Sequence, residues 1–143
     1  MNDKLIREMA TDPGIFRQHL KIEKNFVPVK FGDVCEPWQT NDLQALDAAW
    51  TQLAGWAPFD PKTIRRAYME RGRGHGKTTE LAIGCTHAMV FATRPLVGIA
   101  AAADKDQSQL LSHAVERIVL LNPWLAEVLD VKAYEISGRS GSR

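Results

Sequence analysis

The stretch of residues 71–79, Arg-Gly-Arg-Gly-His-Gly-Lys-Thr-Thr, constrains the possible folds of this chain more than any other. Its end, Gly76-Lys77-Thr78, is what a phosphate-binding (Walker A) loop requires. A glycine lets the backbone approach phosphate oxygens, the lysine carries a positive charge to the β- and γ-phosphates, and the threonine hydroxyl can coordinate Mg²⁺. A helix that begins at such a loop adds unpaired N–H groups and the positive end of its dipole. We therefore predict that Lys77 contacts the phosphates and that Thr78 coordinates the metal ion.

The loop departs from the usual pattern at one position. The pattern G-x-x-x-x-G-K-[ST] places its first glycine at position 71, where this chain has Arg71, and the glycines stand at Gly72 and Gly74 instead. His75 fills a variable position and is not predicted to act as a catalytic base. The residues predicted to contact the nucleotide through this loop are Arg71, Gly72, Gly74, His75, Gly76, Lys77, Thr78 and Thr79.

The segments around the loop indicate a strand–loop–helix unit. Ile64–Glu70 is the expected strand before the loop, although only Ala67-Tyr68-Met69 within it is continuously uncharged. Thr78–Phe91 is apolar on most sides, which is typical of a helix buried against a sheet. Leu96–Ala103 is a continuous apolar run, suited to a parallel strand buried on both faces. A flexible surface loop rich in glycine and arginine is the alternative, but it does not explain a hydrophobic helix that begins at Lys77-Thr78.

The remaining segments complete an α/β pattern. After a capping box at Asp104 and Gln107, an amphipathic helix runs to Leu121. A short helix over residues 123–129 and a strand over Val131–Ile136 follow. This order predicts an α/β fold with a parallel sheet and flanking helices, and it places the nucleotide at the carboxyl edge of the first strand.

The N-terminal part is predicted to be mainly helical. We expect short helices over residues 3–10 and from Pro13 to about Lys24, and an extended segment over Phe26–Gly32. A longer helix is expected from a capping box at Asn41 and Gln44 up to Gly55. We divide the chain into a helical and extended lead-in, residues 1–33, and an incomplete nucleotide-binding domain, residues 34–143.

Composition excludes few functions. The chain has 143 residues and a formal net charge of +1, so its overall charge does not indicate nucleic-acid binding. Cys35 and Cys85 are far apart in the sequence and complete no metal motif, which favours reduced thiols in a cytoplasmic protein. The N-terminus has no apolar core typical of a signal peptide, and no apolar run is long enough to cross a membrane.

Two features of the sequence, Pro37-Trp38-Gln39 and Arg73-Gly74-His75-Gly76-Lys77-Thr78, resemble the large subunit of tailed-bacteriophage terminases, the motors that package viral DNA. The first is Pro37-Trp38-Gln39 upstream of the loop, which looks like an adenine-recognition element. The amide of Gln39 can donate and accept hydrogen bonds at the edge of adenine, and Trp38 can stack on the base. On residue type alone, Trp38 is equally suited to anchor a hydrophobic core. The second feature is Arg73-Gly74-His75-Gly76-Lys77-Thr78, which matches the family's form Arg-x-x-Gly-Lys-Thr.

The resemblance implies a partial P-loop NTPase fold of the RecA or helicase type and ATP and Mg²⁺ as cofactors. It implies that Arg73 contacts the γ-phosphate as an arginine finger, a role worth on the order of 10³–10⁵ in rate. Arg71 competes for that role, and a solvated arginine that braces the loop is the alternative for either side chain. By resemblance, the parent protein hydrolyses ATP to move double-stranded DNA into a procapsid in the host cytoplasm, as a ring of subunits that meets a small terminase subunit and the portal protein.

One part of the expected active site is missing from the sequence. An ATPase of this class needs a Walker B strand, whose Asp holds Mg²⁺ and whose Glu activates water, and no such run follows Lys77. The family's nuclease domain is also missing, so we expect this chain to be the N-terminal part of a longer protein. Another helicase-like P-loop ATPase and a nucleotide-binding fragment without turnover stay open as alternatives.

Overall fold

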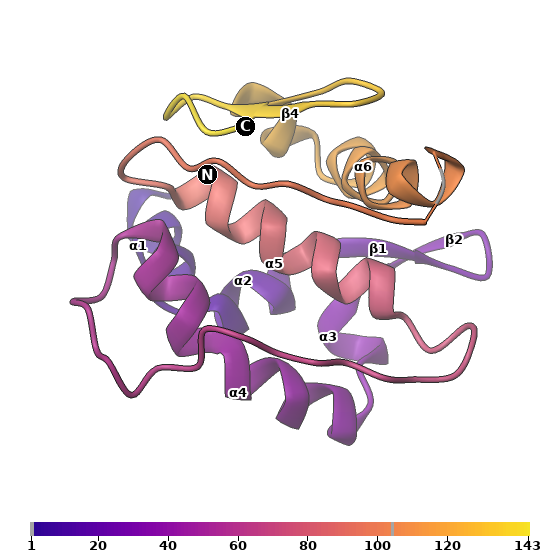
Figure 1. The fold of residues 1–143 in the computed structure, drawn as a ribbon, viewed down its shortest axis with the longest axis horizontal. Helices are drawn as coiled ribbons and strands as arrows, with labels where there is room; N and C mark the ends of the chain where they lie inside the picture. The colour runs from indigo at the N-terminus through magenta and orange to yellow at the C-terminus, as the bar shows by residue number, and fades with distance from the viewer. Residues whose placement is uncertain (1, 104) are drawn as a thin grey trace.

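Helix α5 (Lys77–Phe91) lies at the centre of the computed structural model, which describes residues 2–103 and 105–143. Helix α4 (Pro37–Ala54) packs on one side of α5, and helix α6 (Lys105–Leu121) packs on the other (Figure 1). The predicted helix after the loop and the predicted amphipathic helix up to Leu121 are both confirmed. The capping box predicted at Asp104 lies outside the described residues.

The N-terminal part forms two helices and a hairpin. Helices α1 (Asp3–Thr11) and α2 (Pro13–His19) are followed by strands β1 (Lys21–Lys24) and β2 (Val27–Lys30), which pair antiparallel, and by the short helix α3 (Phe31–Val34). The prediction that the second helix reaches Lys24 is wrong. Asn25 and Phe26 have φ angles of 53° and 63°, the left-handed pair of a tight hairpin turn, so residues 21–24 pair with the next strand instead of extending α2.

The C-terminal part also differs from its prediction. The 3₁₀ helix η1 (Pro123–Glu127) leads into strands β3 (Leu129–Val131) and β4 (Ile136–Gly138), which pair antiparallel. The strand predicted over Val131–Ile136 is therefore mostly the turn between two strands. The N–H of Lys132 donates to the carbonyl of Glu135 at 2.8 Å, and this bond closes the turn.

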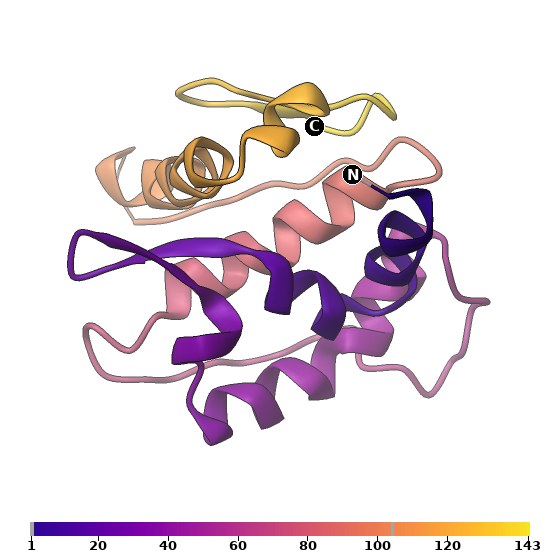
Figure 2. The ribbon, with the colours of Figure 1, turned by 180° about the vertical axis from the view of Figure 1, so that it is seen from behind.

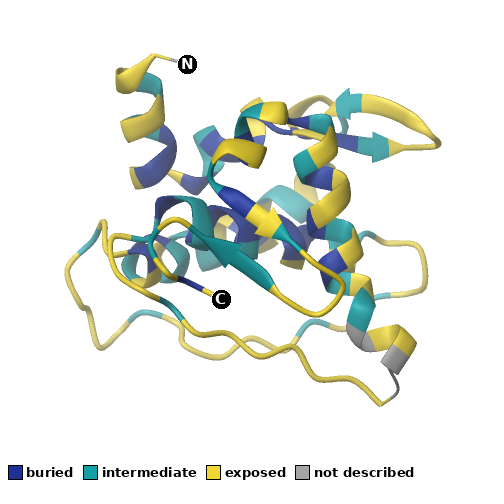
Figure 3. Ribbon diagram, turned by 90° about the horizontal axis from the view of Figure 1, so that it is seen from above, coloured by how far each residue is buried: buried dark blue, intermediate teal, exposed yellow. Residues whose placement is uncertain are grey.

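Neither of the strands predicted before and after α5 in the sequence is formed. Residues 64–70 and 96–103 are extended but have no strand pairing, and their apolar side chains are exposed, with Tyr68 at 88% and Ile99 at 92% (Figure 3). Both segments run in the same direction, one drawn below α5 and the other above it in Figure 1, and they line a cavity of about 960 Å³. A strand that is buried on both faces needs hydrogen-bonding partners along its edges. The backbone of Arg143 donates to the Leu96 carbonyl and accepts from the Gly98 N–H, both at 2.9 Å, but no described strand pairs along either segment. The described strands therefore form only short antiparallel pairs.

The hydrophobic core joins the N-terminal helices to α5. Phe16 of α2 is fully buried, and its ring contacts His87 and Phe91 of α5 at centroid distances of 5.3 and 5.6 Å. Trp124 of η1 approaches the same ring edge-on at 6.3 Å. Edge-to-face packing of this kind adds stability beyond the area that is buried. The core therefore fixes the far end of α5 and leaves its first turn at the surface.

The sequence also predicted that both cysteines are reduced and that no segment is long and apolar enough to cross a membrane. Cys35 and Cys85 are both free thiols, in agreement with the expectation of reduced cysteines. Burial raises the pKa of the Cys85 thiol. Within the described part of the chain, no helix combines the length and apolar character needed to cross a membrane.

We predict that the core makes stability depend on pH through His87. Burial lowers the pKa of His87 to about 4, although its Nε2–H donates to the Met9 carbonyl at 3.0 Å. The ring is therefore neutral in the folded protein and gains a proton on unfolding near its ordinary pKa of 6.5. The free energy of unfolding should fall by about 3 kcal/mol between pH 6.5 and pH 4 because of this residue.

Urea unfolding of the wild type and His87→Leu at several pH values measures this contribution. The variant should lack that part of the pH dependence. Equal slopes for the two proteins between pH 6.5 and pH 4.5 would show that His87 does not couple folding to protonation.

Candidate functional site

The first turn of α5 has the backbone geometry of an anion site. Gly76 is the N-cap residue with φ of 74°, and Gly74 two residues earlier has φ of 83°, both in the left-handed region that favours glycine. The first bond of the helix runs from the Glu80 N–H to the Gly76 carbonyl at 2.9 Å. The N–H groups that precede Glu80 in this turn therefore have no helical partner. A helix start of this kind attracts phosphate through its N–H groups and its dipole.

The start of α4 lies directly against this loop. A Cβ atom on Gly76 would stand 3.4 Å from Nε2 of Gln39 and 3.6 Å from a carboxylate oxygen of Glu80. Trp38 and Gln39 were predicted to precede the helix, but they lie in its first turn. Helix α4 begins earlier than the Asn41 and Gln44 box predicts. Pro37 stands at its start, and Glu36 and Gln39 form a capping box there. The predicted adenine element and the predicted phosphate loop are thus neighbours.

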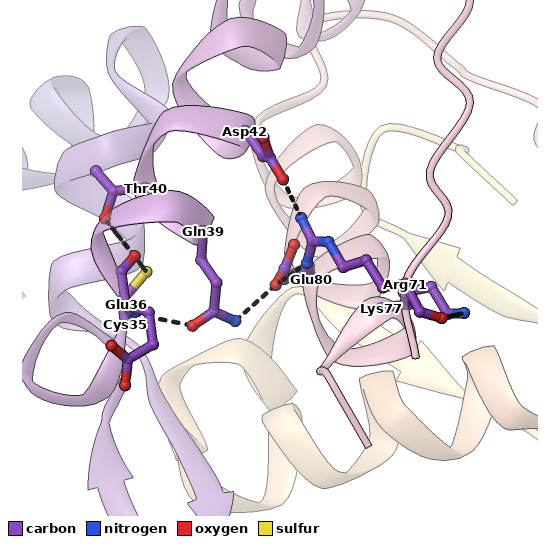
Figure 4. Close-up of polar contacts among 8 residues, drawn as sticks. All are labelled: Cys35, Glu36, Gln39, Thr40, Asp42, Arg71, Lys77 and Glu80. Carbon is purple, nitrogen blue, oxygen red and sulfur yellow. Dashed lines mark hydrogen bonds and ion pairs between the residues drawn. The ribbon is translucent and has the colours of Figure 1, made fainter. Parts of the chain in front are cut away.

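Glu80 joins the two elements (Figure 4). Its oxygen Oε1 accepts a hydrogen bond from Nε2 of Gln39 at 2.7 Å and another from Nη1 of Arg71 at 2.5 Å. Nη2 of Arg71 donates to a carboxylate oxygen of Asp42 at 2.6 Å. The side chains of Arg71 and Glu80 are 8% and 1% exposed, whereas that of Asp42 is 53% exposed. A buried charge pair of this kind is held in place because breaking it would leave an uncompensated charge.

The Arg71 guanidinium also covers Trp38. The guanidinium carbon lies 4.5 Å from the centre of the indole ring, and the ring of His75 meets the same indole edge-on at 6.5 Å. Burial alone would lower the pKa of Arg71, but its hydrogen bonds to Glu80 and Asp42 outweigh that effect and raise the pKa. Trp38 is 43% exposed, so it serves here as a platform for Arg71 and not as an anchor of the hydrophobic core.

Two cavities flank the first turn of α5. The smaller, of about 440 Å³, is bounded by the start of α4, the phosphate loop and the β1–β2 hairpin, whose tip lies at the same end of the molecule as the loop (Figure 2). Its lining includes Trp38, Gln39, Gly74, His75, Gly76, Thr79 and Glu80. The larger cavity, between the unpaired extended segments, is lined by Lys77 and Thr78. The predicted site residues therefore divide between two adjoining spaces.

The two candidate arginine fingers have different environments. Arg71 is held by Glu80, Asp42 and Trp38, and its carbonyl accepts a hydrogen bond from Nζ of Lys77 at 2.5 Å. Arg73 is exposed, and so is Gly72 between the two arginines. A held arginine braces a loop, whereas an exposed one is free to reach a ligand. The two arginines therefore differ in that Arg71 is held by three side chains and Arg73 is exposed.

Sequence reasoning missed the residues that connect the site. The sequence predicts no role for Glu80, Asp42 or the hairpin. The available signal was the arginine in place of the first glycine, because a buried guanidinium requires a carboxylate partner. Among the described residues, no group of His, Cys, Asp or Glu side chains is arranged to hold a metal ion.

Comparison with known proteins identifies one family. The family model described as "Terminase large subunit, ATPase domain" matches residues 46–140, which is most of the chain. The matched region contains the phosphate loop and helices α5 and α6, and begins after Trp38 and Gln39. Searches among curated proteins and among solved structures give no match.

We predict that Arg71 and Arg73 differ in their effects on stability. Arg71→Ala removes a partner from the buried Glu80 carboxylate and should lower the free energy of unfolding by about 3 kcal/mol. Arg73→Ala, the matched control from the same loop, should change it by less than about 0.5 kcal/mol because this side chain is exposed. Chemical denaturation measures both values, and similar losses for the two variants would contradict the bracing role of Arg71.

Proposed function

The chain belongs to the family of terminase large-subunit ATPase domains, and we propose that it forms the ATP-binding part of a motor that packages viral DNA. The observation that carries the proposal is the contact between the start of α4 and the phosphate loop. Through Glu80, this contact places the predicted base-binding residues Trp38 and Gln39 beside the predicted phosphate-binding backbone. One nucleotide can contact the base-binding side chains and the phosphate-binding backbone together only if the two groups lie within the length of that nucleotide.

In this proposal, ATP crosses the first turn of α5 from one cavity to the other. Adenine occupies the smaller cavity against Trp38 and Gln39, and the phosphates lie over the loop that ends at Gly76. Lys77 and Thr78 line the larger cavity, so the γ-phosphate and Mg²⁺ belong on that side. The residues fit the cofactor, because the helix start offers free N–H groups and a Cβ on Gly74 would meet nothing within 4 Å.

Several side chains change position when ATP binds in this proposal. Lys77 leaves the Arg71 carbonyl, to which it now donates, and turns toward the β- and γ-phosphates. Arg73 contacts the γ-phosphate as the finger supplied in cis, whereas Arg71 keeps the loop attached to α4. The hydroxyl of Thr78 would hold Mg²⁺, which would neutralise the charge of the phosphates.

We further propose that residues 64–70 and 96–103 become neighbouring elements of the parallel sheet of a P-loop fold. They run in the same direction, one drawn below α5 and the other above it in Figure 1, and both line the larger cavity. An extended segment that entered this cavity would hydrogen-bond to both and would cover Ile64 and Ile99, which are now exposed. Residues 34–143 then form the nucleotide-binding domain, and residues 1–33 supply the hairpin wall of the base cavity.

The function of the family extends the proposal to DNA. ATP hydrolysis would drive double-stranded DNA into a procapsid in the host cytoplasm, with a ring of subunits acting beside a small terminase subunit and the portal protein. A second candidate, nucleotide binding without turnover, has one observation in its favour. Among the described residues that line the cavity beside Lys77 and Thr78, none is acidic, so no group there can activate water.

We predict that the 143-residue chain binds ATP·Mg²⁺ weakly and hydrolyses it negligibly. Lys77→Ala should weaken ATP binding at least about tenfold, because it removes a charge-assisted hydrogen bond to phosphate. Arg73→Ala should leave the affinity within about threefold, since a finger acts mainly on the transition state.

Titration calorimetry and a phosphate-release assay test these statements. If ATP binds equally well to the wild type, Lys77→Ala and Gln39→Ala, the assignment of the nucleotide site fails. Steady turnover by the chain that is abolished in Lys77→Ala would contradict the account of binding without turnover.

A further inference from the structure

We propose that Glu80 fixes the orientation of the Gln39 amide, and that this makes the smaller cavity selective for a purine with a 6-amino group. The inference deepens the proposed function and rests on it, since it concerns the base of the nucleotide held by the phosphate loop. Glu80 itself does not touch the base in this proposal. It is a positioning residue that acts through Gln39.

The argument begins with the hydrogen bonds of the Gln39 amide. Its oxygen accepts from the N–H of Glu36 at 2.9 Å, and its nitrogen donates to Oε1 of Glu80 at 2.7 Å. The amide lies between these two partners (Figure 4). The Glu36 N–H can only donate and the Glu80 carboxylate can only accept, so the oxygen and nitrogen of the amide cannot exchange places.

An oriented amide still has hydrogen-bonding capacity for a ligand. A glutamine side chain carries two N–H groups and two lone pairs, and each described contact uses one of them. One donor and one acceptor are left, and Gln39 lines the smaller cavity together with Trp38 and Gly76. A donor beside an acceptor matches the amino group and ring nitrogen on the edge of adenine. Hypoxanthine has a carbonyl in place of the 6-amino group, so the same fixed amide meets it with the wrong polarity.

Arg71 keeps Glu80 in place for this task. Both Arg71 and Gln39 donate to the same oxygen of Glu80, while the second oxygen is buried with no hydrogen-bond partner among the described residues. The carboxylate is 1% exposed, so water does not compete for it. We therefore expect base selectivity to depend on the side-chain length of residue 80, which determines whether it contacts Gln39, more than on the charge of residue 80.

A matched pair of substitutions separates reach from charge. Glu80→Gln keeps the side-chain length, and its amide oxygen can accept from both Arg71 and Gln39. Glu80→Asp keeps the negative charge that pairs with Arg71, but its side chain is one methylene too short to hold Gln39. Asp42→Asn serves as a control, because Asp42 contacts Arg71 and not Gln39. Gln39→Asn shortens the other partner of this hydrogen bond by one methylene, so the amide no longer reaches Glu80. It tests the inference independently if Glu80→Asp does not fold.

The measurement is the ratio of dissociation constants for ATP and ITP, with Mg²⁺, by titration calorimetry on the whole chain. The wild type, Glu80→Gln and Asp42→Asn should prefer ATP by at least about tenfold. In Glu80→Asp and Gln39→Asn the amide loses its hydrogen bond to residue 80 and is no longer held from both sides, so the preference should fall to within about threefold of unity. A purely structural role for Glu80 would weaken both nucleotides equally and leave the ratio unchanged.

The outcomes separate this inference from the proposed function. Retention of the ATP preference in Glu80→Asp or Gln39→Asn, or its loss in Glu80→Gln alone, would overturn the positioning role. Equal binding of ATP and ITP by the wild type would also overturn it, while nucleotide binding itself would stand. A wild-type chain that binds neither nucleotide would contradict the proposed function and the inference with it.

Discussion

The site depends on one buried ion pair, between Arg71 of the phosphate loop and Glu80 of the helix that follows it. A loop with glycines at positions 72, 74 and 76 has little side-chain packing of its own, so an ordered conformation needs an external tie. The pair supplies that tie, and the bond from Gln39 to the same carboxylate extends it to α4. Because both charges are buried, the arrangement is favourable only when all three side chains are present together. The missing first glycine of the phosphate-loop pattern is thus part of what holds the loop to its neighbour.

The sequence predicted the helices well because their signals are local. Apolar spacing and end residues identified α5 and α6 and the start of α2 at Pro13. Strands were harder, since pairing depends on partners far along the chain. Residues 64–70 and 96–103 have apolar stretches but form no described strand, and residues 21–30 form a hairpin that their composition did not indicate. For the site, the motif located the loop and Gln39, but no pattern in one sequence states that a carboxylate at position 80 lies within 2.7 Å of an amide at position 39.

The family assignment and the geometry of the site rest on different residues. The family model matches residues 46–140, whereas Trp38 and Gln39 stand before that range, so their place beside the loop is independent support for a nucleotide site. The larger cavity on the other side of the loop contributes Lys77 and Thr78 but no described acid. Arg73, in the same loop, is exposed.

Amide hydrogen exchange with and without ATP·Mg²⁺ tests most directly whether α4 and the phosphate loop form one nucleotide site. The account predicts slower exchange both in residues 72–79 and at Trp38 and Gln39 when ATP is present. Exchange in β3 and β4, which lie away from the loop, should not change. Protection of the loop without protection of Trp38 and Gln39 would show that the base binds elsewhere. An absence of protection at the loop would contradict the account.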